Sequence, residues 1–403
     1  QLYYNTVVGT NHLTNPTYRA CKNTVMGYCN FPDTISTFDC NTVLGTCNGL
    51  NAICGRSNVV IGDRNACISD SCKLFGSTNV LIGGLNMMRR AYGGYNVAIG
   101  LYNMCGGLLS SANWNLAVGY SNLRDLTTGD FNIGIGCGAG RAVTTATRTI
   151  SIGHAAGLRH VTGNESMYLG AFAGAGIFCG DANVIVGAYA AACYLINNNA
   201  CRNQIFGYAA AQRIGVDSLY NTFIGHGTAC NLRCCTTNNI YIGSFAGLST
   251  AGTIDGNSSN IVIGYYAGHN VCGDGNIFIG CGISNCSAHT SLSEKFHLGY
   301  GSGNCLLVGC LNSGGRTLGI CGTLSKTAGS FQISHPDPAK TQTKDLWHSF
   351  VESPTAGDNL YRFEVEVENG QATIDLPDYY KHLNENDQVW VNAKNHFGRA
   401  YGV

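Results

Sequence analysis

Cysteine is the residue type with the most potential chemistry in this chain of 403 residues, which contains 21 of them. Their side chains could be small buried core groups, disulfide partners or zinc ligands. Three close pairs, each five residues apart, are candidate disulfides: Cys67 and Cys72, Cys281 and Cys286, and Cys305 and Cys310. Because the count is odd, at least one thiol stays unpaired or pairs between chains. No Cys-x-x-Cys doublet exists, so we predict no metal and no cofactor.

Five tyrosines form the second candidate set, since each directly follows a glycine of the repeat described below. They are Tyr28, Tyr120, Tyr208, Tyr265 and Tyr300. Aromatic rings combine an apolar face with a polar tip, and sugar rings stack on such faces. These tyrosines are therefore candidate glycan contacts. The alternative is that they fill corners of the fold or contacts between chains.

Acidic groups give little indication of catalysis. Glycan hydrolysis needs two carboxyl groups about 5–10 Å apart, and the best pair is Asp125 with Asp130, which also suits a turn. His348, Ser349 and Glu352 are close in sequence, but neighbours in sequence rarely form a triad. We therefore expect no enzyme.

Charge and hydropathy exclude further classes of protein. The 23 basic residues equal the 23 acidic ones, which argues against nucleic-acid binding because that rests on clustered Lys and Arg. No apolar run approaches the roughly 18 residues that cross a bilayer. The chain is also 45% hydrophobic, so it is expected to fold.

A short repeat organises most of the sequence. The phrase Asn-Thr-Val-Val-Gly at residues 5–9 recurs with small changes in 17 copies, whose last residue we call the anchor glycine. The spacing of the anchors is 16–21 residues, and weaker copies follow at Gly309 and Gly319. A fixed period near 18 residues predicts an all-β fold, a parallel β-solenoid of about 17–19 coils.

Positions counted from the anchor glycine have different physical roles. Position −1 is always apolar and predicts an inward row, which position −3 should share because side chains alternate along a strand. Position −4 is Asn in 14 of 17 copies and predicts a stacked amide ladder, while the glycine permits a bend.

The opposite face of the predicted strand is also apolar. Position −2 is apolar in 14 of 17 copies, including Val25, Ile185 and Phe223. A strand that is apolar on both faces must be covered on both. We therefore expect position −2 to pack against other copies in a parallel homotrimer. A wider single-chain coil that buries both faces is the alternative.

Composition changes near residue 322. Residues 322–403 hold 18 of the 46 charged residues, four of the six prolines and no cysteine. We therefore predict two domains, a solenoid shaft over 1–321 and a small antiparallel β domain over 322–403 that caps it. Within the second, residues 361–367 and 371–376 alternate around Asn369-Gly370, which predicts a hairpin. A third strand is expected over 388–392 and a short helical turn over 378–384.

The repeats resemble those of phage and large-DNA-virus tail fibres, and more distantly the head repeats of trimeric autotransporter adhesins. The segments at 331–336, 346–354 and 372–380 resemble a region that follows such repeats in fibre-like proteins. The resemblance implies a homotrimeric, extracellular or virion-bound fibre that contacts host surfaces. Family members continue beyond this region, so the chain is expected to be part of a longer protein.

The function expected from these features is that of a viral structural fibre that reaches and attaches to the host cell. Expected partners are further copies of the chain, a glycan or protein receptor on the host, and other virion proteins through terminal regions outside this sequence. No nucleic acid and no membrane span are expected. Two alternatives stay open: a bacterial surface adhesin of similar build and a polysaccharide-degrading tailspike.

Overall fold

The computed structural model describes the chain in two units, Gln1–Gly322 and Thr323–Val403, which divide one residue from the predicted boundary. The description omits residues 1–3, 13–19, 31–37, 50–54, 67–75, 88–92, 107–110, 193–198, 233–235, 250–256, 271–272, 284–292, 302–303, 312–315, 323–330, 336, 338, 341–342, 349–360, 384–388 and 393–403.

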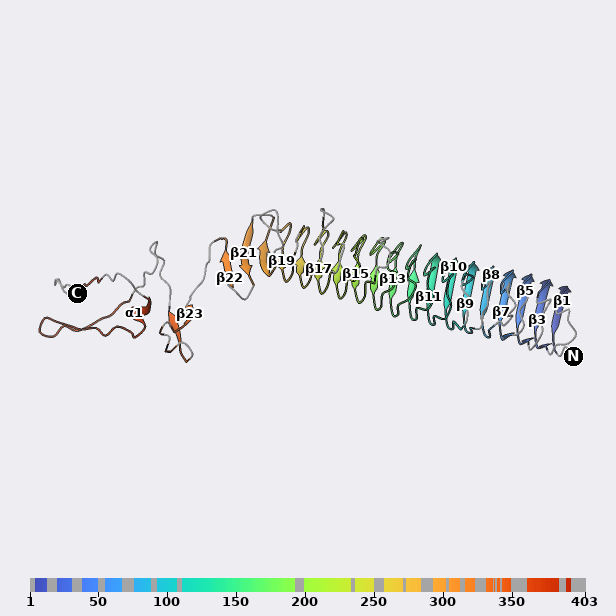
Figure 1. The fold of residues 1–403 in the computed structure, drawn as a ribbon, viewed down its shortest axis with the longest axis horizontal. Coiled ribbons are helices and arrows are strands. Elements are labelled where there is room, and N and C mark those ends of the chain that lie inside the picture. Colours follow the sequence, from blue (N-terminus) through green and yellow to red (C-terminus); the bar gives the residue numbers. More distant parts are fainter. Residues whose placement is uncertain are drawn as a thin grey trace. The chain divides into compact units, whose positions relative to one another are not determined.

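The first unit is a β-solenoid, so the predicted all-β fold class is confirmed. Each anchor glycine lies in, or directly after, one strand of a 19-stranded sheet, and the strands lie side by side along the unit (Figure 1). The successive parallel strands are β1 (Thr6–Thr10), β3 (Thr24–Tyr28), β5 (Thr42–Thr46), β7 (Val59–Asp63), β8 (Val80–Gly84), β9 (Val97–Leu101), β10 (Leu116–Tyr120), β11 (Ile133–Cys137), β12 (Ile150–Ile152), β13 (Met167–Leu169), β14 (Val184–Val186), β15 (Gln204–Phe206), β16 (Thr222–Ile224), β17 (Ile240–Ile242), β18 (Ile261–Ile263), β19 (Ile277–Ile279) and β20 (Lys295–Gly299).

The parallel stack ends before the last two weak repeats. Strand β21 (Cys305–Cys310) pairs antiparallel with β20, and β22 (Thr317–Ile320) pairs antiparallel with β21. The expectation that Gly309 and Gly319 continue the coils is therefore wrong. Strand β21 thus covers the hydrogen-bonding edge of β20, and the short strand β22 becomes the edge of the sheet.

A second, shorter row of pairing runs along the solenoid. It begins as a parallel sheet of β2 (Ala20–Cys21), β4 (Phe38–Asp39) and β6 (Gly55–Arg56). Isolated parallel bridges, such as the series Cys201–Leu219–Thr237–Ser258, continue this kind of pairing in later coils. Each coil is thus tied to its neighbours by backbone hydrogen bonds on more than one side.

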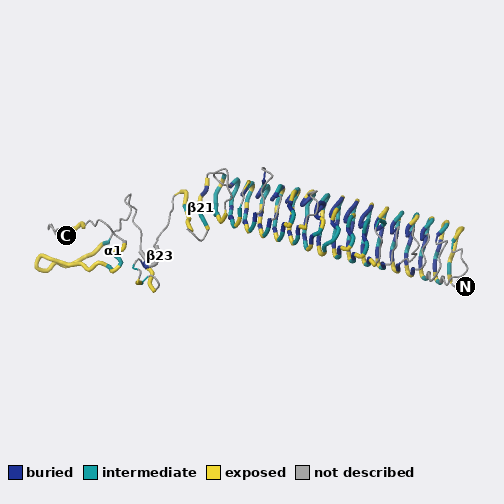
Figure 2. The backbone as a smooth tube through the Cα atoms, viewed as in Figure 1, coloured by how far each residue is buried: buried dark blue, intermediate teal, exposed yellow. Residues whose placement is uncertain are grey.

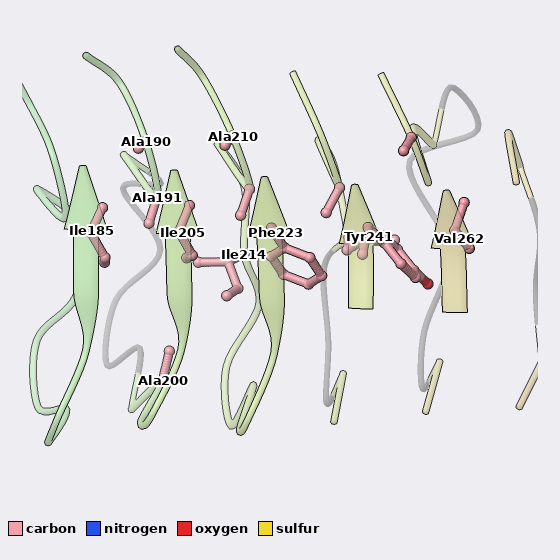
Figure 3. Close-up of a cluster of buried hydrophobic side chains, with 14 of the residues drawn as sticks. Ile185, Ala190, Ala191, Ala200, Ile205, Ala210, Ile214, Phe223, Tyr241 and Val262 are labelled. Carbon is pink, nitrogen blue, oxygen red and sulfur yellow. The ribbon is translucent and has the colours of Figure 1, made fainter. Parts of the chain in front are cut away.

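The two faces of the strands are the reverse of what the sequence analysis predicted. Position −2, which was expected to contact other chains, is buried inside the single chain in all but the first and last copies: Val25, Ile185 and Phe223 are all 0% exposed. Figure 3 shows this position on successive strands, where Ile185, Ile205, Phe223, Tyr241 and Val262 form one row across the sheet. Positions −1 and −3 point outward instead: Ile224, next to the buried Phe223, is 40% exposed. The physical reason is that the middle residue of the short strand faces the narrow interior, so both of its neighbours must face out.

Two asparagine ladders run through this interior. In the inner ladder, at position −4, each amide oxygen accepts from the next coil; for example, Asn41 donates to Asn23 Oδ1 from its backbone N at 2.9 Å and from Nδ2 at 3.1 Å. This confirms the predicted amide ladder. The corner ladder, at position +3, was not predicted and consists of Asn30, Asn48, Asn65, Asn86, Asn103 and Asn122.

The anchor glycines are required by both conformation and space. Their φ angles lie between +113° and +139° in all but the last copy, a region that side chains with a Cβ rarely adopt. A Cβ on Gly119, for example, would lie 2.0 Å from the carbonyl oxygen of Gly136 in the next coil. The repeat therefore cannot exchange this glycine for alanine without moving the backbone of two coils.

The corners change type midway along the shaft. As far as β11 the strands are five residues long and continue through the anchor glycine, whereas β12 to β19 have three residues and end before it. Position +3 changes from Asn122 to Ala139 at this point. In later coils the amide at this position bonds to its own anchor carbonyl, as Ala190 N does to Gly187 O at 3.3 Å. Burial of the interior continues through both halves (Figure 2).

The second unit contains less regular structure than predicted. Strands β23 (Phe331–Ser334) and β24 (Asp345–His348) form an antiparallel pair, and α1 (Tyr380–Leu383) confirms the helical turn. The turn at Asn369-Gly370 is present, with positive φ at both residues and a bridge between Glu368 and Gln371. Its arms, 361–367 and 372–376, and residues 389–392 are not strands, so those predictions are wrong; residue 388 lies outside the described part.

Candidate binding surface

All five predicted tyrosines lie at the surface, at position +1 of their coils. Their exposed fractions run from 49% for Tyr120 to 70% for Tyr300. They nevertheless differ in what surrounds them. Tyr28 is near the amide of Asn11, whose Nδ2 lies 3.4 Å from the tyrosine oxygen. Tyrosines next to the anchor glycine are thus exposed, but only some of them have a ring face that a ligand could contact.

Ring stacking occupies many of the aromatic faces. One row joins Tyr95, Trp114 and Phe131 with centroid distances of 5.2 and 5.1 Å and nearly parallel planes. A longer row runs through successive coils and consists of His154, Phe172, Tyr189, Tyr208, His226, Phe245 and Tyr266. Within it, Tyr208 and His226 are stacked at 5.3 Å. Because stacked rings cover each other, a sugar cannot reach the face of Tyr208 that His226 occupies.

A groove of about 520 Å³ lies next to one end of the longer row. It spans the corners that follow β9 to β13 and is lined mainly by Tyr102, Tyr120, His154, Phe172, Arg124 and Arg141. Tyr102 and Tyr120 meet edge to face, with centroids 5.9 Å apart and planes at 86°. Of the five predicted tyrosines, Tyr120 is the one in this lining.

The two arginines of the groove have different electrostatic environments. Arg124 binds both oxygens of Asp125, with Nε–Oδ1 at 2.8 Å and Nη2–Oδ2 at 2.9 Å, and this carboxylate raises the pKa of the guanidinium. Arg141 is exposed, and its guanidinium makes no ion pair with any residue in the described part of the chain. The groove therefore carries one uncompensated positive charge.

These arginines were not identified from the sequence, although a signal was available. Each lies five residues after an anchor glycine, Arg124 after Gly119 and Arg141 after Gly136. Equivalent positions in neighbouring coils stack along the axis, so two arginines at the same position in consecutive repeats predict a local basic patch.

The carboxylates suggested for catalysis have structural partners. Asp125 holds Arg124, as described above, and Asp130 Oδ1 accepts from the backbone N of Asn113 at 2.7 Å. Ser349 and Glu352 lie outside the described residues, as does the side chain of His348. The described part of the chain contains no cluster of three or more His, Cys, Asp or Glu side chains that could hold a metal ion.

The cysteine predictions have mixed outcomes. Cys305 and Cys310 begin and end strand β21, so their Cα atoms are about 17 Å apart at roughly 3.4 Å per residue, far beyond a disulfide's reach; that pairing is wrong. Cys67, Cys72 and Cys286 lie outside the described residues. Among the described cysteines only Cys305 is buried, so the interpretation of the repeat cysteines as buried core groups is also wrong.

A buried polar pair lies in the shaft beside the groove. His160 is 0% exposed; its Nδ1 lies 3.1 Å from the hydroxyl of Tyr168 and its Nε2 lies 3.0 Å from Gly163 O. Burial lowers the pKa of His160 to about 4 and raises the pKa of Tyr168. With both of its ring nitrogens engaged and no access to water, His160 is a structural residue that satisfies the Tyr168 hydroxyl.

Comparisons with family models, with curated proteins and with solved structures found no match to this chain. No helix among the described residues has the length and hydrophobicity needed to cross a membrane. The fold and composition define a cysteine-rich β-solenoid repeat protein, whose exposed aromatic and arginine side chains at the coil corners form its candidate binding surface.

Proposed function

We propose that this chain is a structural fibre protein of a virus, which assembles as a homotrimer and attaches the particle to the host cell surface. The observation that carries the proposal is the outer face of the sheet, formed by positions −1 and −3 of each coil. Position −1 consists of Val8, Met26, Leu44, Ile61, Ile82, Ile99, Val118, Ile135, Ile152, Leu169, Val186, Phe206, Ile224, Ile242, Ile263, Ile279 and Leu298.

The outer face is continuous, mostly apolar and uncharged: position −1 is apolar in every copy, and position −3 is polar in five of the 17 copies, four with Thr and one with Gln204. Neither of its two positions holds a charged residue in any of the 17 copies, and Met26, Leu169 and Ile224 are each about 40% exposed. At about 4.8 Å per strand the face would be roughly 80 Å long. Monomeric soluble proteins rarely expose a contiguous apolar patch of this size, because its hydration is unfavourable.

Further copies of the same chain can cover this face along its whole length. Three parallel copies whose outer faces turn toward a common axis bring each coil beside its equivalents, so the spacing of the apolar rows matches from end to end. This arrangement replaces the trimer that the sequence analysis derived from position −2. The uninterrupted hydrogen-bonded stack supports a role in mechanical reach, and the exposed aromatic corners support a role in attachment.

The assembly is tested by native mass spectrometry of the full chain. The unmodified protein is expected to be a trimer, and Ile224→Lys combined with Ile263→Lys is expected to release monomers because it places two charges on the outer face. Ser259→Lys is the matched control, since this exposed position holds Lys22 and Arg148 in other coils, and should leave the trimer intact. A monomeric or dimeric mass for the unmodified protein would contradict the proposal.

The viral attachment role needs a separate experiment. Antibodies raised against the purified chain should label fibres on virus particles in electron micrographs, and the purified chain should compete with those particles for binding to host cells. Labelling of a bacterial cell envelope instead would identify the adhesin alternative. Release of reducing sugar from a host glycan would identify the tailspike alternative.

A further inference from the structure

The groove over β9 to β13 combines the exposed guanidinium of Arg141 with aromatic rings whose faces are not fully stacked. Its lining includes two arginines and no carboxylate. Since Asp125 neutralises Arg124, the charge that remains is that of Arg141. A guanidinium donates two parallel hydrogen bonds to a carboxylate, sulfate or phosphate group, which makes it a specific anion ligand.

We propose that this groove binds an acidic saccharide, with a sugar ring against Tyr120 and the carboxylate or sulfate of the saccharide on Arg141. The inference rests on the proposed attachment function, for which it names a ligand class and a site. The volume of about 520 Å³ lies within the range of small-molecule sites and suits a short oligosaccharide segment.

The aromatic geometry favours a sugar ligand. The edge-to-face contact between Tyr102 and Tyr120 leaves ring faces free of parallel stacking. The second pair in the lining, His154 and Phe172, also meets at 85°, although one face of Phe172 stacks on Tyr189. The hydrophobic C–H face of a pyranose packs on such a ring, while the tyrosine hydroxyls can bond to its hydroxyl groups.

The same features argue against a nucleic acid as the natural ligand. Phosphate backbones are bound by several cationic groups along their length, whereas the groove presents one uncompensated arginine. The proposed trimer interface would leave the groove accessible, because none of the groove's lining residues belongs to positions −1 or −3 of the outer face. All of them follow the anchor glycine of their coil.

Binding is tested with the full chain on an array of sialylated, uronate-bearing and sulfated oligosaccharides beside their desialylated, carboxyl-reduced and desulfated counterparts. We expect at least one acidic class to bind at least tenfold more tightly than its neutral counterpart. Arg141→Gln and Tyr120→Ala should each weaken that binding at least tenfold. Arg213→Gln and Tyr220→Ala are controls outside the groove and should change it less than twofold; the Tyr220 ring is 51% exposed and lies at position −5 of its coil.

Protection of a thiol gives a second readout that does not depend on array chemistry. Cys137 is exposed and lines the groove, so the bound oligosaccharide should slow its alkylation at least threefold without affecting Cys321. Equal binding of acidic and neutral sugars, full binding by Arg141→Gln, or no protection of Cys137 would overturn the proposal. Binding of a DNA oligonucleotide as tight as that of the saccharide would also overturn it, because charge alone would then suffice.

The two proposals fail in different ways. If the unmodified chain is a trimer that competes for host cells, but Arg141→Gln competes equally well, the groove inference fails and the fibre proposal stands. If the chain binds acidic sugars through Arg141 but is a monomer, the fibre proposal fails and the groove inference stands. Thermal unfolding of each variant should match that of the unmodified chain, since both substituted residues are at the surface.

Discussion

Replacing one asparagine in the middle of the corner ladder should destabilise the shaft strongly. Asn103 is 0% exposed. Its Nδ2 donates to Asn86 Oδ1, Ile99 O and Gly119 O at 3.2, 3.1 and 3.0 Å, and its Oδ1 accepts from Asn122 N at 3.0 Å. Asn103→Ala removes all four hydrogen bonds and leaves the buried amide of Asn122 without its acceptor.

The magnitude follows from these contacts. An orphaned buried donor costs about 1–3 kcal/mol, and each of the two Nδ2–H groups, which share the three acceptors, contributes about 0.5–1.5 kcal/mol. We therefore expect a loss of about 2–6 kcal/mol, whose upper part is exceptional for a single substitution. Asn103→Asp should not rescue it, since a carboxylate at this site would face three acceptor oxygens.

The assay is native-state hydrogen exchange, because a repeat stack opens locally rather than as one unit. Faster exchange should concentrate in the coils around Asn103. Asn238→Ser is the control, since this exposed position holds Ser57 and Ser259 in other coils, and it should change the opening free energy by less than about 0.5 kcal/mol. An Asn103→Ala loss no larger than that of the control would refute the assignment of stability to the ladder.

Three further substitutions or conditions test other parts of the shaft. Gly119→Ala should abolish folding of the solenoid, as judged by circular dichroism and solubility, because the residue has φ +122° and its new Cβ would clash with Gly136 O. Burial lowers the pKa of His160 from 6.5 to about 4, so protonation of this histidine favours the unfolded state. The free energy of unfolding should therefore be highest above about pH 6.5 and should fall by about 3 kcal/mol as the pH is lowered toward 4. Denaturant unfolding should show this loss in the unmodified chain and a smaller one in His160→Gln. Alkylation followed by mass spectrometry should modify the exposed Cys137 before Cys230, since burial raises the pKa of the Cys230 thiol.

The repeat made the fold class predictable, but not the way in which the solenoid ends. A fixed spacing of apolar strands, asparagine and glycine requires stacked coils, and the parallel strands follow it copy by copy. The antiparallel strands β21 and β22 were misjudged because Gly309 and Gly319 keep the apolar residue before the glycine. That pattern specifies a strand but not its direction, which is set by the connections between strands.

The exposed tyrosines of the binding surface could be predicted from position +1, but their accessibility could not. Tyr120 and Tyr208 occupy the same position in their coils, yet Tyr120 lines the groove and Tyr208 stacks on His226. The difference depends on which residue of the neighbouring coil packs against the tyrosine ring. Arg141 was missed for a related reason. Its charge is uncompensated because Asp125 pairs with Arg124, and the sequence does not show which of the two arginines this carboxylate binds.

The inward direction of position −2 was also encoded in the sequence, in side-chain volumes rather than in hydrophobicity. Positions −2 and +4 face each other across the narrow coil, and in several coils a small residue at one accompanies a large residue at the other. Small Ala117 at position −2 accompanies Leu123 at +4, whereas large Tyr168 accompanies Gly174, whose Cβ would lie 2.1 Å from the Tyr168 ring.

Compensation also extends between neighbouring coils. The coil of Gly134 has a second glycine at +4, Gly140, and Leu123 from the preceding coil fills the space, because a Cβ on either glycine would lie 2.9 Å from its side chain. Position −1 shows no such exchange of large for small, since it holds a large apolar residue in every copy. Interior rows must vary together to keep the core filled, whereas a row that meets equivalent rows of other copies can stay uniform. The uniformity of position −1 therefore supports its assignment to an interface between chains.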